Sequence, residues 1–153
     1  MRIRAATEDD FTKVVKLYAE FASGPDLRSR PRRQADWRAI VSHPGTTVFV
    51  AEEVVRLVGM ATLHVLPNMT RGGQPYALIE NVLTASSDRN RGIGRKVMER
   101  AIEAAAAENA YKIMLLTNKY RGDDDARGFY EKLGFTADAK FGMVLRPAAG
   151  QVS

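Results

Sequence analysis

Residues 76–117 carry the pattern that most restricts what this chain can fold into. Two apolar runs typical of strands, 76–84 and 111–117, lie on either side of residues 92–108, in which apolar side chains recur at helical spacing. A strand followed by a crossover helix and a second strand places the two strands parallel in one sheet. The sequence therefore predicts a βαβ unit in the second half of the chain.

The residues before this unit predict antiparallel strands in the same sheet. Runs 46–53 and 56–66 are rich in β-branched and apolar residues around a short polar turn at Glu52 and Glu53, which is typical of a hairpin. The other expected elements are an edge strand at 1–6, helices at 7–21, 34–43 and 123–135, and a last strand at 140–147. The predicted fold class is α/β, of the mixed α+β kind, with a mixed antiparallel and parallel sheet and flanking helices.

Length and composition favour one domain and exclude several kinds of chemistry. At 153 residues the chain fits a single domain, expected over 1–146, with a C-terminal tail at 147–153. Cysteine is absent and His43 and His64 are the two histidines, so we expect no metal site, no disulfide and no cysteine nucleophile. No apolar run reaches the roughly 18 residues of a membrane span, so we expect a cytoplasmic protein that does not bind membranes.

The net charge of +5 is concentrated in two arginine-rich stretches, 28–38 and 89–100. Such clusters favour anionic partners. Nucleic acid satisfies that charge, but the arginines are not interleaved with exposed-looking aromatic residues, and no helix-turn-helix or RNA-binding signature is present. We therefore expect an anionic partner other than nucleic acid, and a nucleic-acid binder stays an alternative.

The turn Arg89-Asn90-Arg91-Gly92-Ile93-Gly94 leads from the first strand of the predicted βαβ unit, 76–84, into its helix. The start of a helix has unpaired N–H groups and partial positive charge, and glycine lets a phosphate approach them closely. A Walker loop is excluded because no Lys-Ser/Thr pair follows Gly94, and the dinucleotide fingerprint lacks its third glycine, where Val97 stands. The turn is a candidate pyrophosphate site, and the structural alternative is a loop that shapes the helix start.

A second motif, ARGFYEKLGF at residues 126–135, places the glycine turn in a known context. With it, the chain resembles the GNAT superfamily of acyl-CoA-dependent N-acetyltransferases over nearly its full length, from Arg2 to Arg146. Residues 89–94 match the Arg/Gln-x-x-Gly-x-Gly/Ala pyrophosphate loop of that family, and residues 126–135 match its aromatic pair followed by Gly-Phe. Asn90 departs from the pattern, since relatives often have glycine there, and Ala85-Ser86 stands where many have a polar residue and proline.

The resemblance implies acetyl-CoA as cosubstrate and no metal. In the family the cofactor lies where two parallel strands splay apart, with its pantetheine arm along the first strand and its pyrophosphate in the glycine turn. The cofactor-binding residues implied here are Val82, Leu83, Thr84, Arg89, Asn90, Arg91, Gly92, Ile93, Gly94, Arg95 and Asn118. Asn118 is equally plausible as a turn residue.

The family chemistry is attack by a neutral amine on a thioester, which needs a proton donor for the leaving thiolate. Tyr130 stands in the position of the family's tyrosine, and a phenol with a pKa of about 10 stays protonated at neutral pH. The alternative is a core tyrosine. Glu80 is the candidate base, because strand alternation places it on one face with Val82 and Thr84, although relatives often use a water relay instead. His64 is a weaker candidate base.

The acceptor is less constrained by the sequence. Arg28 and Arg30, in the loop after the first helix, are candidates for binding a phosphate or carboxylate of the acceptor, or they face water. The segments IENVLT and YKIMLL also resemble the glucosamine-6-phosphate acetyltransferase branch. The function expected is acetyl transfer from acetyl-CoA to a primary amine of a small molecule, an amino sugar phosphate being one candidate. Acetylation of a protein amine and a non-catalytic acyl-CoA-binding module are the alternatives, and a homodimer is expected from the family.

Overall fold

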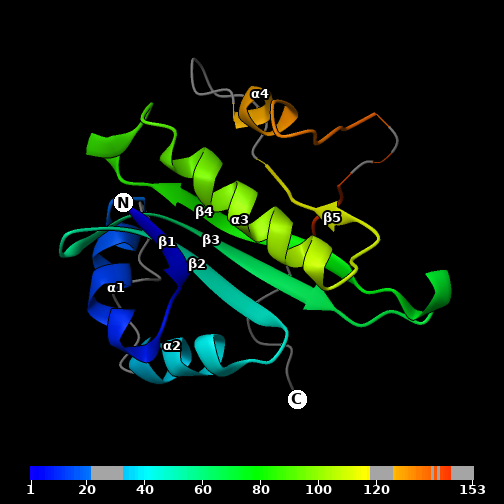
Figure 1. Ribbon diagram of the computed structural model, residues 1–153, viewed down its shortest axis with the longest axis horizontal. Coiled ribbons are helices and arrows are strands. Elements are labelled where there is room, and N and C mark those ends of the chain that lie inside the picture. Colours follow the sequence, from blue (N-terminus) through cyan, green and yellow to red (C-terminus); the bar gives the residue numbers. More distant parts are fainter. Residues whose placement is uncertain (22–32, 118–125, 139, 141, 146–153) are drawn as a thin grey trace. The chain divides into compact units, whose positions relative to one another are not determined.

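The computed structural model describes residues 1–21, 33–117, 126–138, 140 and 142–145 (Figure 1). The chain forms two compact units, Met1–Leu115 and Leu116–Ser153. The first unit contains the sheet and most of the helical residues. Its organisation is what positions the candidate site.

In the described residues of the first unit the sheet has five strands, whose order in space follows the sequence. They are β1 (Arg2–Ala5), β2 (Thr46–Glu53), β3 (Arg56–Leu66), β4 (Tyr76–Thr84) and β5 (Ile113–Met114). The pairs from β1 to β4 are antiparallel, whereas β4 and β5 are parallel. The predicted mixed sheet is confirmed.

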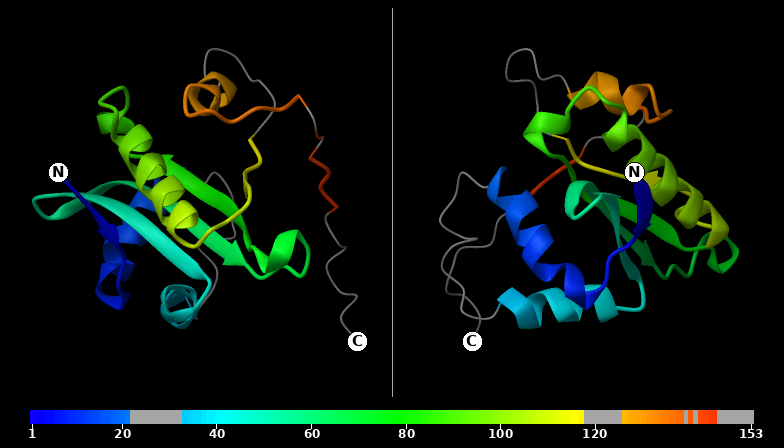
Figure 2. Two further views of the ribbon diagram at one scale, coloured as in Figure 1. Left: turned by 45° about the vertical axis from the view of Figure 1, so that its right-hand side comes forward. Right: turned by 60° about the vertical axis from the view of Figure 1, so that its left-hand side comes forward.

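Helices cover both faces of this sheet. The first unit contains α1 (Phe11–Ala19), α2 (Arg33–Ser42) and α3 (Ile93–Ala107), with 3-10 turns η1 (Glu8–Asp10), η3 (Arg71–Gly73) and η4 (Ser86–Asp88). Figure 2 shows α1 and α2 on one face and α3, the crossover helix between β4 and β5, on the other. In the described ranges, no helix combines the length and apolar character needed to cross a membrane.

Alternation along β2 supplies both layers of the core. Val48 and Val50 belong to the cluster that α1 and α2 cover, whereas Phe49, between them, lies under the guanidinium of Arg100 in α3, 5.2 Å from its ring centre. All three β2 side chains are buried, and each such side chain contributes roughly 1.5–3 kcal/mol. The α3 residues that complete the second layer are Ile93, Val97, Met98, Ala101 and Ala105.

The β2–β3 hairpin turns two residues later than predicted. Glu52 and Glu53 lie within β2, where Glu53 pairs with Arg56, and the turn is made by Val54 and Val55. Val54 has a φ of 52° and is 96% exposed, which is unusual for a β-branched residue. Polarity alone predicts a turn at this pair, whereas both carboxylates form ion pairs with other elements.

The second unit has α4 (Ala126–Glu131) as its described helix. Gly134 forms a left-handed cap after this helix, since its φ is 91° and the N–H of Phe135 donates to the Tyr130 carbonyl oxygen at 3.2 Å. The strand expected at 140–147 is not found in the part described, 142–145. An apolar run becomes a strand where a neighbour pairs with it, and the described residues give this one no partner strand.

A cluster of charges joins the N-terminal elements to the end of β2. Arg4 donates to both carboxylate oxygens of Asp10, at 2.7 and 2.8 Å, and to Glu52 at 2.9 Å. Lys13 in α1 donates to the other oxygen of Glu52 at 2.7 Å. The bonds from Arg4 and Lys13 lower the pKa of Glu52 to about 2, and the bond from Arg4 also lowers the pKa of the buried Asp10.

Because these carboxylate pKa values are lower in the folded chain than in the unfolded one, the cluster stabilises the fold above about pH 4.3 and loses this effect as the pH falls towards about 2. We expect Glu52→Gln to lower the melting temperature by a few degrees at pH 7, and the difference from wild type to shrink between pH 5 and pH 2.5. Circular dichroism melts across this range measure it, with the exposed Glu108→Gln as control. A difference that is constant with pH would contradict this account.

Candidate active site

Strands β4 and β5 are paired for a short distance, and β4 then continues without β5 as a neighbour. Ala77 pairs with Ile113 and Leu78 with Met114, and within the described residues no further pair joins the two strands. β4 extends six residues beyond Leu78 to Thr84. A strand side left without a neighbour offers its main-chain groups to another extended molecule.

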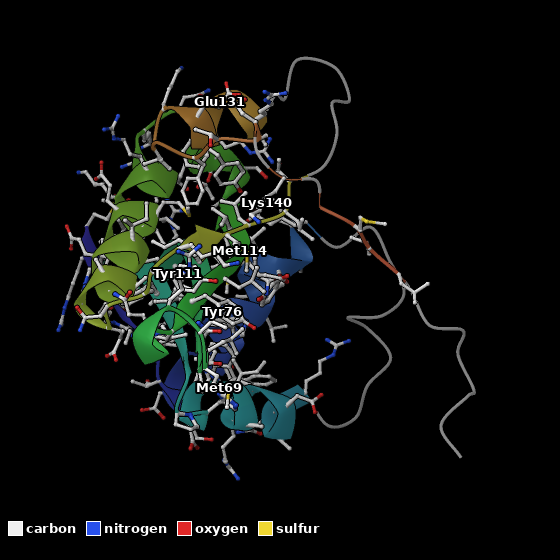
Figure 3. The ribbon with its side chains drawn as sticks, turned by 90° about the vertical axis from the view of Figure 1, so that its right-hand side faces the viewer. Met69, Tyr76, Tyr111, Met114, Glu131 and Lys140 are labelled. Atoms are coloured by element: carbon white, nitrogen blue, oxygen red, sulfur yellow. The ribbon has the colours of Figure 1, made fainter. Side chains whose placement is uncertain are left out.

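The closed end of this strand pair is held by aromatic rings around a cation. Figure 3 shows Tyr76, Tyr111 and Met114 at this end. The Lys112 ammonium lies 5.5 Å from the ring centre of Tyr76 and 5.3 Å from that of Tyr111. The Tyr111 N–H also donates to the carbonyl oxygen of Pro75 at 2.9 Å. These contacts hold β4 and β5 together at the end where the two strands pair.

A β-bulge interrupts the pairing of β4 with β3 in the part of β4 that no longer has β5 as a neighbour. The register places Glu80 opposite Thr62 and Leu83 opposite Met60, so β4 has two residues where β3 has one. Asn81, directly after Glu80, has a φ of 52°. Asparagine adopts this left-handed conformation more readily than most residues, and a bulge bends its strand and increases the twist. The bulge lies immediately before the segment predicted to bind pantetheine.

The bulge changes which β4 side chains share a face. Glu80 lies on the face that α1 covers, together with its cross-strand partner Thr62. After the bulge it is Leu83 that packs against the α1 and α2 cluster. The expectation that Glu80 shares a face with Val82 and Thr84 is therefore wrong, because strict alternation assumes that no residue is inserted between them.

Glu80 itself is exposed. Its cross-strand partner Thr62 is buried and forms a hydrogen bond with the hydroxyl of Tyr18 in α1. Burial raises the pKa of the Tyr18 phenol. His64, the weaker candidate base, lies in β3, two residues after Thr62, and its Nδ1 is 2.9 Å from the hydroxyl of Thr46. Glu80 is accessible to a substrate on the α1 face, and its role as base stays a prediction.

The glycine turn after β4 has two residues in the left-handed conformation. Gly92 has a φ of 74° and Asn90 a φ of 62°, and α3 begins at Ile93. A Cβ added at Gly92 has nothing within 4 Å, so its left-handed backbone, and not crowding, favours glycine there. The N–H groups of the first turn of α3 have no partner within the helix and face the turn.

The arginines around this turn contact other protein groups. The guanidinium of Arg89 lies 5.7 Å from the ring centre of Phe21, and Arg95 donates to Glu99, one turn further along α3, at 2.7 Å. Arg91 donates to Glu53 at 3.0 and 3.3 Å and also to Asp88. Their predicted contacts with phosphate stay predictions, and for Arg91 such a contact competes with two carboxylates.

Asp88 is a residue that the sequence analysis missed. Its side chain is 2% exposed, and its carboxylate accepts two hydrogen bonds from Arg56, at 2.6 and 2.9 Å, one from the Ser87 hydroxyl at 2.7 Å and one from Arg91. The Arg56 guanidinium holds the pKa of Asp88 well below its usual range, so the group is ionised at neutral pH. The signal available in the sequence was a single acidic residue beside several arginines. Its role could not be predicted from that signal, because its partner Arg56 is 32 residues away.

Tyr130 lies in α4 of the second unit. Its ring makes edge-to-face contacts with Phe129 and Phe135, with centres 5.1 and 6.2 Å apart. Burial raises the pKa of the Tyr130 phenol, so it keeps its proton at neutral pH, as a proton donor must. Its catalytic role stays a prediction.

Three predicted site residues, Arg28, Arg30 and Asn118, lie outside the described residues. Among the residues that are described, no group of three or more histidine, aspartate or glutamate side chains is arranged to hold a metal ion.

Known proteins resemble this chain over most of its length. A glucosamine 6-phosphate N-acetyltransferase from Trypanosoma brucei brucei is 30% identical over 138 residues, which are 90% of this chain and 90% of that protein. A solved structure from Agrobacterium tumefaciens, named as a candidate acetyltransferase, is 41% identical with a TM-score of 0.86, and the match covers 96% of this chain and 100% of that one. The crystal structure of a Trypanosoma brucei acetyltransferase is 27% identical with a TM-score of 0.79, over 95% of this chain and 99% of that one.

The profile of the acetyltransferase (GNAT) family matches residues 11–135, from the start of α1 to just past the cap of α4. This match includes the diverging strands, the glycine turn and the aromatic pair. The chain belongs to the acetyltransferase (GNAT) family and is an acetyl-CoA-dependent N-acetyltransferase.

Proposed function

We propose that this enzyme acetylates the primary amine of a small phosphorylated molecule, with an amino sugar phosphate of the glucosamine 6-phosphate type as the first candidate acceptor. The observation that carries this choice is the similarity to the glucosamine 6-phosphate N-acetyltransferase of Trypanosoma brucei brucei over 90% of both chains. The arginine-rich segment 28–33 supports it by composition, since a phosphate ester needs cationic partners. Arg28 and Arg30 are the proposed contacts.

The cofactor site we propose lies along β4 and the turn after it. Val82, Leu83 and Thr84 offer main-chain groups to the pantetheine arm on the side where β5 no longer pairs with β4. The pyrophosphate then meets the first N–H groups of α3 beside Gly92, where the peptide dipoles favour negative charge. The remaining turn residues from 89 to 95 and Asn118 complete the proposed set.

The chemistry proposed for this site moves two protons. The nitrogen of the acceptor amine attacks the thioester carbonyl carbon, a C–N bond forms, and the C–S bond breaks as the tetrahedral intermediate collapses. Glu80, directly or through water, takes the proton that the amine loses. Tyr130 gives its proton to the departing thiolate, so that free CoA leaves as the thiol. No metal takes part in this scheme.

The acceptor is tested by following thiol release from acetyl-CoA with a panel of amines. We expect glucosamine 6-phosphate to give a kcat/KM at least tenfold above that of glucosamine, because the phosphate adds charged contacts. Equal values for both sugars would contradict a phosphate-binding acceptor site. Turnover confined to peptide amines would favour acetylation of a protein, and no turnover with any amine would favour an acyl-CoA-binding module.

The catalytic roles are tested by Tyr130→Phe and Glu80→Gln. Loss of a general acid or base lowers rates by roughly 10²–10⁴-fold, so we expect kcat to fall by about two orders of magnitude or more in Tyr130→Phe, and by less in Glu80→Gln if water relays the proton. The affinity for acetyl-CoA is expected to change less than twofold. Tyr111→Phe, at the closed end of the strand pair, is the control and should keep its rate. Wild-type rates in both catalytic variants would refute these assignments.

The glycine turn is tested by comparing Gly92→Ala with Gly72→Ala. Both glycines have a left-handed φ, 74° and 68°, and neither has an atom within 4 Å of an added Cβ. Each substitution should therefore destabilise the fold by a similar amount, about 1–2 kcal/mol. We expect only Gly92→Ala to weaken acetyl-CoA binding, by tenfold or more in titration calorimetry. Equal affinities in the two variants would exclude the turn from the cofactor site.

A further inference from the structure

We propose that Glu53 and Asp88 are positioning residues for the acetyl-CoA pyrophosphate, which act by holding Arg91 and with it the backbone of the Gly92 turn. The inference rests on the proposed cofactor site. It assigns a role to two carboxylates that belong to neither sequence motif of the family.

The first step is the position of Arg91 within the turn. It lies between Asn90 and Gly92, which have φ values of 62° and 74°. Asparagine and glycine adopt the left-handed conformation more readily than other residues, and contacts of the turn with other elements hold it further. The side chain of Arg91, between these two residues, reaches Glu53 in β2, so this contact restrains the backbone of the turn.

The second step is where the Arg91 side chain is held. Its Nη2 donates to one carboxylate oxygen of Glu53 at 3.0 Å, and its Nη1 donates to the other at 3.3 Å. Glu53 is the last residue of β2 and is paired with Arg56, the first residue of β3. The turn is thereby attached to the closed end of the β2–β3 hairpin.

The third step is the buried carboxylate that completes the cluster. Asp88, in η4, accepts hydrogen bonds from both Arg56 and Arg91. The four side chains thus alternate in sign, from Glu53 to Arg91, to Asp88 and to Arg56. The β4–α3 connection is also held at its start, where the Ser86 N–H donates to the carboxylate of Glu20 at 2.8 Å.

The sign of the charges separates this role from simple electrostatics. Glu53 and Asp88 are negative and lie beside a turn that we propose binds a diphosphate, so removing either charge should strengthen binding if only Coulomb forces acted. A positioning role requires the opposite result, because loss of the carboxylate releases Arg91 and the turn.

The test uses the isosteric variants Glu53→Gln and Asp88→Asn of the full chain. We expect the Kd for acetyl-CoA, measured by calorimetry, to rise at least fivefold, with kcat at saturating acetyl-CoA within twofold of wild type. Glu103→Gln, an exposed residue of α3, removes the same charge and is the control, with an unchanged or slightly lower Kd. Glu53→Gln leaves the Asp88 pairs in place, and so provides a folded variant should Asp88→Asn not fold.

A second donor confines the effect to the pyrophosphate. S-acetylpantetheine has the thioester and the pantetheine arm but no diphosphate, and its kcat/KM is expected to be the same in wild type and Glu53→Gln. An unchanged or lower Kd for acetyl-CoA in Glu53→Gln, or an equal loss with both donors, would overturn the positioning role alone. Failure of the wild type to bind acetyl-CoA would overturn the cofactor site itself, and this role with it.

Discussion

The hydrogen bonding of β4 differs on its two sides, and the candidate site depends on this difference. Towards β3 the strand is paired along nearly all of its length, interrupted by the bulge at Asn81. Towards β5 the described pairs end at Leu78. β3 keeps β4 extended, and the proposed cofactor site uses the other side of β4, where the described residues give no strand partner beyond Leu78. The rings around Lys112 keep the two strands together at one end.

Much of this fold was predictable because its signals are local. The bounds of β2, β3 and β4 follow from runs of apolar and β-branched residues, and the left-handed Gly92 and Gly134 follow from glycine at the start and end of helices. The bulge was not predictable, since it is defined by the register against β3 and the β4 sequence alone reads as regular alternation. The hairpin turn at Val54 and Val55 was missed for a related reason: two exposed valines carry no turn signal.

The candidate site shows the same division between near and distant information. Position in the motifs was enough to find the turn and to nominate Tyr130, whereas Glu80 was nominated from a strand alternation that the bulge interrupts. The partners of Arg91 were not accessible, because Glu53 is 38 residues away in the sequence and becomes a neighbour through the packing of the β2–β3 hairpin beside the turn. An arginine in a phosphate-binding motif reads as a phosphate ligand until its distant partners are known. The same holds for buried Asp88, whose structural role in a basic segment depends on its ion pair with the distant Arg56.

The alternating cluster of two acids and two arginines also bears on ionic strength. Its four formal charges sum to zero, so this part of the turn adds little long-range attraction for an anion despite the basic sequence around it. Peptide dipoles at the first turn of α3 add a short-range attraction, which acts over distances shorter than the roughly 8 Å Debye length of physiological salt. We therefore expect binding of the cosubstrate at the proposed turn to depend less on dissolved salt than the binding of a polyanion to an open arginine surface does.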